Sequence, residues 1–164
     1  MEFSFEEVLT GLRNGDFSRM SPAFDESSGE SAIMKWHQEG SFGNHPAELD
    51  EAVSCAAFLG RPVTLQFLLD SGLSPEGGGM TGLNAIHWAS NRGHLETFRQ
   101  LLKAGAKLEV RNMYGGTVLG LTVWSAINEP RGEQLQIIRE LIAAGADVSE
   151  VEKPTGRPEI DELL

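Results

Sequence analysis

The sequence contains a single cysteine, Cys55, among its 164 residues. One cysteine cannot form an intramolecular disulfide, so the sequence fits a reducing compartment rather than a disulfide-stabilised extracellular fold. No uninterrupted apolar run approaches the roughly 18 residues needed to cross a bilayer. Residues 1–7 are acidic and lack the basic segment that opens a secretory signal peptide. These absences predict a cytoplasmic protein that is not inserted in a membrane.

Basic residues are scarce as well, with 13 Lys and Arg against 24 Asp and Glu, for a net charge of −11. Residues 1–49 carry nine acidic and three basic side chains, residues 50–112 carry six of each, and residues 113–164 carry nine and four. A protein that binds nucleic acid needs clustered Lys and Arg to displace counterions from phosphate. The sequence therefore predicts no nucleic-acid partner and no binding to an anionic membrane. The acidic ends suit a protein partner with a basic surface, although they would equally keep an extended protein soluble.

An internal repeat of 33 residues is the strongest positive signal, because Gly105 follows Gly72 at that interval. At the same offset, apolar and glycine positions coincide in pairs: Val53 with Ile86, Ala56 with Ala89, Gly60 with Gly93, Leu65 with Phe98, and Leu68 and Leu69 with Leu101 and Leu102.

A third copy has a longer interval in its second half. Thr117 still lies 33 residues after Asn84, whereas Gly145 lies 40 residues after Gly105. We therefore expect an insertion of seven residues, near residues 127–132, between the two helices of the third copy.

Each copy has the pattern of two short helices. Small apolar residues, such as Ala85 and Ala89, lie on the first helix, and larger ones, such as Leu95, Phe98 and Leu101, recur at helical spacing on the second. Gly60 and Gly93 follow the first helices of two copies and Gly105 follows a second helix, where glycine permits the positive φ that ends a helix. One such hairpin cannot cover its own apolar face, so the copies must stack on one another.

Residues 82–96, GLNAIHWASNRGHLE, resemble the ankyrin pattern G-x-T-P-L-H-x-A-x-x-x-G-H-x-E. Asn84 and Ala85 replace the Thr and Pro of that pattern, the third copy has Gly120 in place of the motif histidine, and the first copy lacks the T-P-L-H element. The resemblance covers about residues 50–149. Residues 109–117 and 128–130 are further similar to small bacterial ankyrin proteins. The resemblance implies an all-α solenoid of stacked helix-turn-helix hairpins, with short β-hairpin-like loops between repeats.

We expect three repeats, at residues 50–78, 79–111 and 112–149, between two capping segments. Residues 1–49 are predicted to form a degenerate repeat with a long loop, and residues 150–164 a C-terminal cap with a short helix starting at Pro158. In the N-terminal segment, a capping box of Ser4 and Glu7 predicts a helix that ends at Gly15. Residues 17–24 are candidates for the second helix of this hairpin. A loop at residues 25–46 should hold about one helical turn, with Ile33 and Trp36 packed on the stack.

No set of catalytic residues emerges from the sequence. His87 and His94 occupy ankyrin motif positions, where a structural role is expected. His37 and His45, with Glu39 between them, match no zinc-binding spacing. Residues 77–79 are all glycine but lack the Lys and Ser or Thr of a phosphate-binding loop. The sequence predicts no enzyme, no cofactor and no metal site.

The resemblance implies a concave binding surface made by the loop tips and the exposed side of the first helices. Its variable positions correspond to ten residues here: Phe58, Met80, Thr81, Leu83, Asn91, Arg92, Arg111, Met113, Tyr114 and Trp124. Aromatic, Met and Arg side chains are enriched at protein interfaces. Phe58 and Trp124 could instead pack against neighbouring loops.

These features predict a protein-interaction module that binds a partner protein through its concave face, as an inhibitor, an antidote or a regulator. Two alternatives stay open. One is an accessory subunit or weak enzyme that uses His37, Glu39 and His45 in the N-terminal loop. The other is a scaffold that covers its concave face by forming a homodimer. We expect a monomer, with the homodimer left open.

Overall fold

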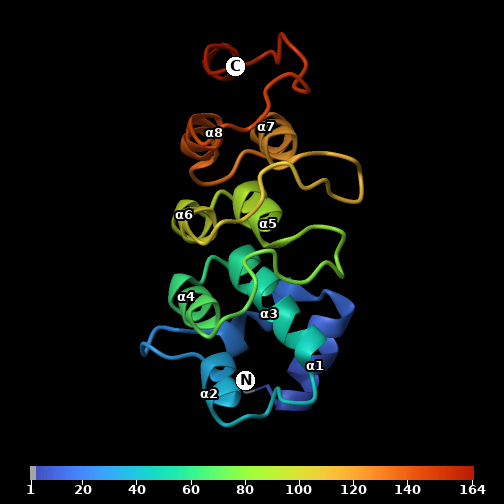
Figure 1. Ribbon diagram of the computed structural model, residues 1–164, viewed down its shortest axis with the longest axis vertical. Coiled ribbons are helices and arrows are strands. Elements are labelled where there is room, and N and C mark those ends of the chain that lie inside the picture. The colour runs from blue at the N-terminus through green and yellow to red at the C-terminus, as the bar shows by residue number, and fades with distance from the viewer. Residues whose placement is uncertain (1–2) are drawn as a thin grey trace.

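The computed structural model describes residues 3–164, which form helices joined by loops and contain no strand. Six of the helices make three stacked pairs in two columns (Figure 1). The inner column contains α3 (Pro46–Leu59), α5 (Ala85–Arg92) and α7 (Val118–Asn128), and the outer column contains α4 (Pro62–Asp70), α6 (Leu95–Lys103) and α8 (Gln134–Ala143). The predicted all-α solenoid of helical hairpins is therefore confirmed.

Side-chain size explains why the two columns stack. Ala52, Ala56 and Ala89 are fully buried on the inner helices, where their small side chains let neighbouring helices approach closely. Larger buried side chains fill the space between the outer helices, among them Leu65, Leu68, Phe98, Leu101, Ile137 and Leu141. The result is one continuous core along the stack, which no single hairpin could form alone.

The inner helices begin and end as their sequences indicate. Asn84 caps α5 by accepting a hydrogen bond from the His87 backbone N–H, and Thr117 caps α7 through the Gly120 N–H. Gly60 and Gly93, with φ of 65° and 71°, end α3 and α5 in the left-handed region.

The N-terminal segment closes one end of the stack with three short elements, α1 (Phe5–Asn14), the 3-10 helix η1 (Phe17–Phe24) and α2 (Ala32–Gln38). The capping box is present, since the Ser4 hydroxyl accepts from the Glu7 N–H and the Glu7 carboxylate accepts from the Ser4 N–H.

The expectation that residues 17–24 are the second helix of this hairpin is wrong. η1 packs against the inner helix α3, and α2 instead packs against α4 in the outer column. The physical reason is that α2 supplies the apolar side chains for that position: Ile33 is fully buried and Trp36 packs against the core.

The insertion in the third repeat only partly forms a loop. α7 has 11 residues where α5 has 8, so three of the extra residues lengthen the helix. Three more lie in the longer connection at residues 129–133, and the last lengthens α8, which has 10 residues where α6 has 9.

At the other end of the stack, α9 (Pro158–Asp161) forms the C-terminal cap, and its Ile160 is fully buried. Pro158 begins this helix as predicted. The repeat and cap boundaries drawn from the sequence stay predictions. None of the helices within residues 3–164 has the length and apolar character needed to cross a membrane.

Candidate protein-interaction surface

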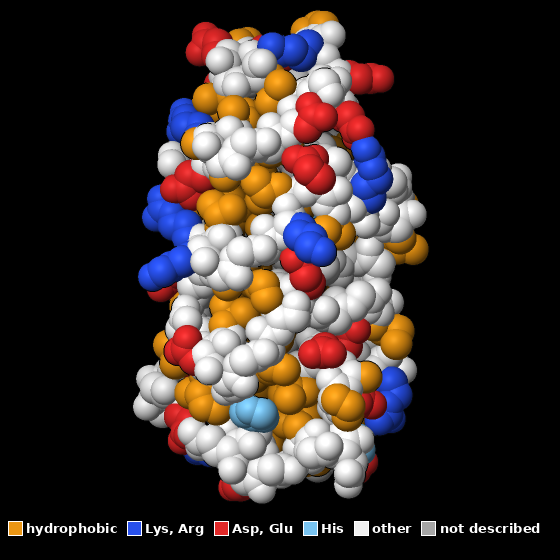
Figure 2. Space-filling model, in the orientation of Figure 1, with side chains coloured by type: hydrophobic (Ala, Val, Ile, Leu, Met, Phe, Trp, Pro, Cys, Tyr) orange, Lys and Arg blue, Asp and Glu red, His pale blue; other side chains and the backbone are white. Residues whose placement is uncertain are grey.

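Two loops project from the inner column on the same side of the stack (Figure 1). We call residues 76–84, which precede α5, the first finger, and residues 109–117, which precede α7, the second finger. Hydrophobic side chains protrude along this edge of the molecule (Figure 2).

The first finger is held against α3 by a buried carboxylate. Glu51, only 7% exposed, accepts a hydrogen bond of 2.8 Å from the Met80 N–H, and the Ser54 hydroxyl donates to the Gly78 carbonyl at 2.8 Å. A Cβ on Gly78 would lie 2.2 Å from the Glu51 carboxylate, so glycine is needed for this close approach. The finger therefore presents Met80 to solvent, where it is 57% exposed.

The second finger is shaped by Asn112. The Asn112 side-chain oxygen accepts from the N–H groups of Tyr114 at 2.9 Å and Gly116 at 3.0 Å. The Met113 N–H donates to the Gly82 carbonyl at 2.9 Å and so joins the two fingers. This backbone leaves the side chains of Met113 and Tyr114 pointing outward, with exposures of 65% and 81%.

Trp124, 52% exposed, lies on α7 next to the second finger. Within residues 3–164, five large hydrophobic side chains are exposed, and four of them belong to the fingers or α7: Met80, Met113, Tyr114 and Trp124. The fifth, Val63, is on the outer helix α4. Exposed apolar side chains are therefore concentrated on one side of the molecule, as at protein-binding surfaces.

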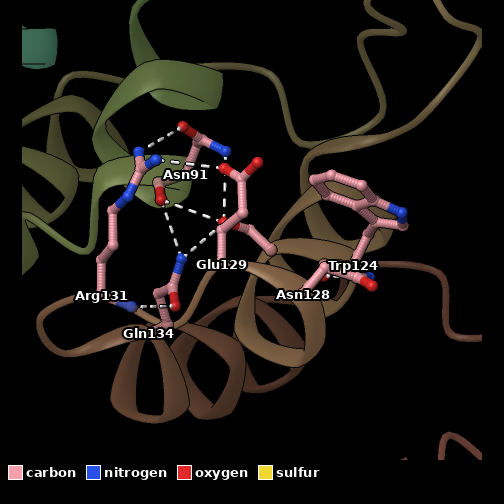
Figure 3. Close-up of polar contacts among 7 residues, drawn as sticks. Asn91, Trp124, Asn128, Glu129, Arg131 and Gln134 are labelled. Atoms are coloured by element: carbon pink, nitrogen blue, oxygen red, sulfur yellow. Dashed lines mark hydrogen bonds and ion pairs between the residues drawn. The ribbon is translucent and has the colours of Figure 1, made fainter.

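Figure 3 shows how the insertion supports the turn of α7 that follows Trp124. Asn128, in the added turn, donates to the Trp124 carbonyl at 2.9 Å. Arg131 reaches back to Glu129 at 3.1 Å and to the Asn91 side chain at 3.5 Å. The insertion is thus folded onto α5 instead of projecting freely.

Tyr114 and Trp124 face a groove of about 490 Å³ between the second finger and α7. The remaining lining residues are Asn112, Gly116, Gly120 and Leu121. In the 33-residue register, Gly116 corresponds to Leu83 and Gly120 to His87, and both of those side chains are buried in the second repeat. The groove is therefore present where two glycines replace two larger residues.

The expectation that Leu83 and Asn91 lie on the surface is wrong, since each is only 8% exposed. Leu83 is buried although it belongs to the first finger. The Asn91 side-chain nitrogen donates to the Ser125 hydroxyl at 3.2 Å, and its side-chain oxygen lies 3.5 Å from the Arg131 guanidinium. A side chain enclosed in this way is not available to a partner.

Phe58 and Arg92 are half-buried instead of free. The Phe58 ring packs edge-on against Trp88, with centroids 4.8 Å apart, and against Phe17. The Arg92 guanidinium lies 4.4 Å from the centroid of Phe58, in a cation–π contact. Thr81 also has an internal role, because its hydroxyl accepts from the Trp88 indole N–H at 2.9 Å. The packing alternative considered for Phe58 therefore holds, whereas Trp124 is exposed.

Arg111 is exposed at the base of the second finger. Its guanidinium forms an ion pair with Glu150 and donates to the Gly115 carbonyl at 2.8 Å. Three residues that line the groove were not predicted as site residues: Asn112, Gly120 and Leu121. The signal that identifies the groove is the contrast between Gly116 and Leu83, and between Gly120 and His87, at equivalent repeat positions.

The histidines and the cysteine are held in internal contacts. His87 is buried, with Nδ1 2.6 Å from the Asn84 side-chain oxygen, and burial lowers its pKa. His94 Nε2 lies 3.0 Å from the Phe58 carbonyl. Burial raises the pKa of the Cys55 thiol well above its usual value, which leaves it unreactive.

The two histidines of the alternative N-terminal site pack edge-on against different phenylalanine rings. His37 packs against Phe67, and His45 packs against Phe5. Across residues 3–164, no three His, Cys, Asp or Glu side chains are grouped in a way that could hold a metal ion.

Comparisons with known proteins identify the repeat. No curated protein gives a significant match to this chain. The family model for ankyrin repeats, in three copies, matches residues 53–152, which is more than half of the sequence. The match falls on the stacked helix pairs and includes both fingers. The chain therefore belongs to the ankyrin-repeat family.

Proposed function

We propose that this protein is a non-enzymatic binding module that holds a partner protein against its fingers and α7. Ankyrin repeats generally serve protein–protein interaction. The observation that carries the proposal is the concentration of exposed Met80, Met113, Tyr114 and Trp124 on the finger side of the stack. Large apolar side chains that stay exposed in the folded protein are typical of surfaces that a partner covers on binding.

The finer proposal is that the complex masks a functional face of the partner, as an inhibitor or antidote does, in the cytoplasm. The net charge of −11 favours a partner with a basic surface, because opposite charges accelerate association. The partner's own activity, measured with and without this protein, tests the inhibitory role. Unchanged activity at saturating protein would refute it.

The test of binding is an affinity pull-down from native cell extract. Wild-type protein is compared with a Tyr114→Ala, Trp124→Ala double variant and with Val63→Ala, which removes an exposed apolar side chain from the outer helix α4. We expect one protein to be retained by wild type and by Val63→Ala and to be lost with the double variant. Circular dichroism checks that each variant keeps its helices.

Equal retention by wild type and the double variant would refute binding at this surface. The homodimer alternative is tested by sedimentation equilibrium over a range of concentrations. In the homodimer alternative, the mass of the wild-type protein rises to twice the monomer value, while the double variant stays at the monomer value. That result would identify a second copy of the chain as the partner.

A further inference from the structure

The groove beside Tyr114 and Trp124 is open because Gly116 and Gly120 leave space unfilled. Neither glycine has a positive φ, so neither is required by its backbone conformation. A Cβ on Gly120 would first meet the Thr117 hydroxyl at 3.4 Å, and one on Gly116 would first meet the Asn112 side chain at 3.5 Å, both ordinary contact distances. Crowding does not explain these glycines either. These two glycines differ from Leu83 and His87, at the equivalent positions of the second repeat, in leaving an open volume.

The lining of the groove favours an apolar occupant. Tyr114, Leu121 and Trp124 supply its side-chain surface. Asn112 is the polar residue of the lining, and its side-chain oxygen already accepts from two backbone N–H groups of the finger. The Asn112 side chain is only 8% exposed, so it supports the finger and leaves recognition of the occupant to the apolar side chains.

The charges beside the groove differ at its two ends. On the finger side, Arg111 is tied to the Gly115 carbonyl and pairs with Glu150, while Glu109 and Asp147 also act on the same guanidinium. Three carboxylates against one guanidinium leave a local charge of −2, which favours a cation there.

Beyond the far end of α7 the balance is reversed. Arg92 and Arg131 lie near the carboxylate of Glu129, and Arg157, paired with Glu159, donates to the Ala126 carbonyl. Cations therefore outnumber carboxylates at this end, which offers no attraction to a further cation. An occupant therefore needs its positive charge on the finger side only.

We propose that the groove receives a short segment of the partner protein, with one aromatic or long aliphatic side chain between Tyr114 and Trp124 and a Lys or Arg beside it, on the finger side. This assignment rests on the proposed function and names the chemistry that the surface recognises. The apolar side chain fills the space that Gly116 and Gly120 leave, and the cation pairs with the carboxylates around Arg111.

The test uses a library of random short peptides displayed on phage, selected against wild-type protein with counter-selection against Gly120→His. That variant places in the groove the residue that the second repeat has at the equivalent position. We expect the enriched peptides to share an aromatic or long aliphatic residue adjacent to Lys or Arg. A synthetic copy of the most enriched peptide is then titrated against purified variants.

Gly120→His and Gly116→Leu should each weaken binding of that peptide by about tenfold or more, since they fill the groove. The milder Gly120→Ala adds one methyl group and is the variant to use if either larger one fails to fold. Glu150→Lys should weaken binding about fivefold at low salt, with the difference shrinking as salt is added. Glu140→Lys is the matched control, because it breaks a comparable Arg–Glu pair on the outer helices and should leave affinity unchanged.

Three results would each overturn the inference: enrichment of acidic peptides, failure to enrich any peptide that prefers wild type to Gly120→His, or equal binding of the peptide by all variants. Its failure is distinguishable from failure of the proposed function. Suppose that a cellular partner is lost with the Tyr114→Ala, Trp124→Ala variant but is still bound by Gly120→His. The proposed binding surface would then stand, and the groove would be excluded as the recognition site.

Discussion

The Gln134 side-chain nitrogen lies 2.8 Å from the backbone oxygen of Asn91, so the second helix of the third repeat is tied directly to the first helix of the second. The same nitrogen donates to the Ser125 hydroxyl at 2.8 Å, and all three residues are buried. Gln134 is therefore the residue through which the insertion is anchored. It begins α8 immediately after the inserted loop, and its side-chain oxygen accepts from the Arg131 N–H at 2.8 Å.

Replacing Gln134 by Ala should lower the free energy of unfolding by about 1–3 kcal/mol, because the buried Asn91 carbonyl, the buried Ser125 hydroxyl and the half-buried Arg131 N–H each lose a hydrogen bond. Gln136→Ala, on the same helix, removes a long hydrogen bond from Arg139 at 3.4 Å on the surface and should change it by less than about 0.5 kcal/mol. Urea denaturation followed by circular dichroism measures both. Equal losses for the two variants would show that the buried network contributes nothing beyond helix propensity.

Gly93 is the second point where the insertion contacts α5. Its carbonyl accepts from the Glu133 N–H at 3.1 Å, its φ is 71°, and a Cβ there would lie 2.3 Å from the Arg131 carbonyl oxygen. Gly105 has a φ of 90° with nothing within 4 Å of a Cβ. Gly105→Ala should therefore cost about 1–2 kcal/mol, for the left-handed backbone alone. Gly93→Ala should cost clearly more in the same urea titration, and an equal loss would mean that the loop moves away freely.

The carboxylate of Glu51 gives the first finger a pH dependence. Its Oε1 accepts from the Met80 N–H, while Oε2 has no hydrogen-bond partner within residues 3–164. Burial raises the pKa of Glu51 above its ordinary value of 4.5, and the Met80 N–H opposes that shift only in part. In the folded protein the carboxyl therefore keeps its proton to a higher pH than in the unfolded chain.

Because the folded state binds more protons than the unfolded state just above pH 4.5, the contribution of Glu51 to stability falls as pH rises through that interval. Glu51→Gln cannot titrate, so it should gain stability relative to wild type between about pH 4 and pH 7. Carboxyls with a lowered pKa, such as Glu48 and Glu140, make stability rise with pH instead. They do so equally in wild type and in Glu51→Gln, so their contribution cancels when the two stability profiles are subtracted. Urea titrations across this range test the sign, and parallel pH profiles for the two proteins would contradict it.

The stack itself could be predicted from the sequence because its signals are local or periodic. The 33-residue interval, the small residues at Ala56 and Ala89, and the glycines at Gly60 and Gly93 each specify a feature of one hairpin. Repetition then requires stacking, since one hairpin leaves its apolar face exposed. The caps at Ser4 and Thr117 are likewise local hydrogen bonds within one helical turn.

The candidate interaction surface was predictable only in outline. Met80, Met113 and Tyr114 are exposed because a finger tip has few neighbours, whatever its residue types. The exposures of Asn91 and Trp124 differ although the two positions are equivalent in the repeat, 33 residues apart. Asn91 is covered by Gln134 and the insertion, whereas Trp124 has only the cap beyond it.

The sequence by itself determined the helical hairpins, their order and the side of the stack on which the fingers lie, because periodicity and glycine placement act within each repeat. The tertiary structure alone decided which surface residues stay exposed, that Phe58 packs against Phe17 and Trp88, and that Gly116 and Gly120 leave a groove open. Burial depends on what a neighbouring segment places against a side chain. That contact is made between residues distant in the chain, such as Gln134 and Asn91, whose spacing follows no repeat.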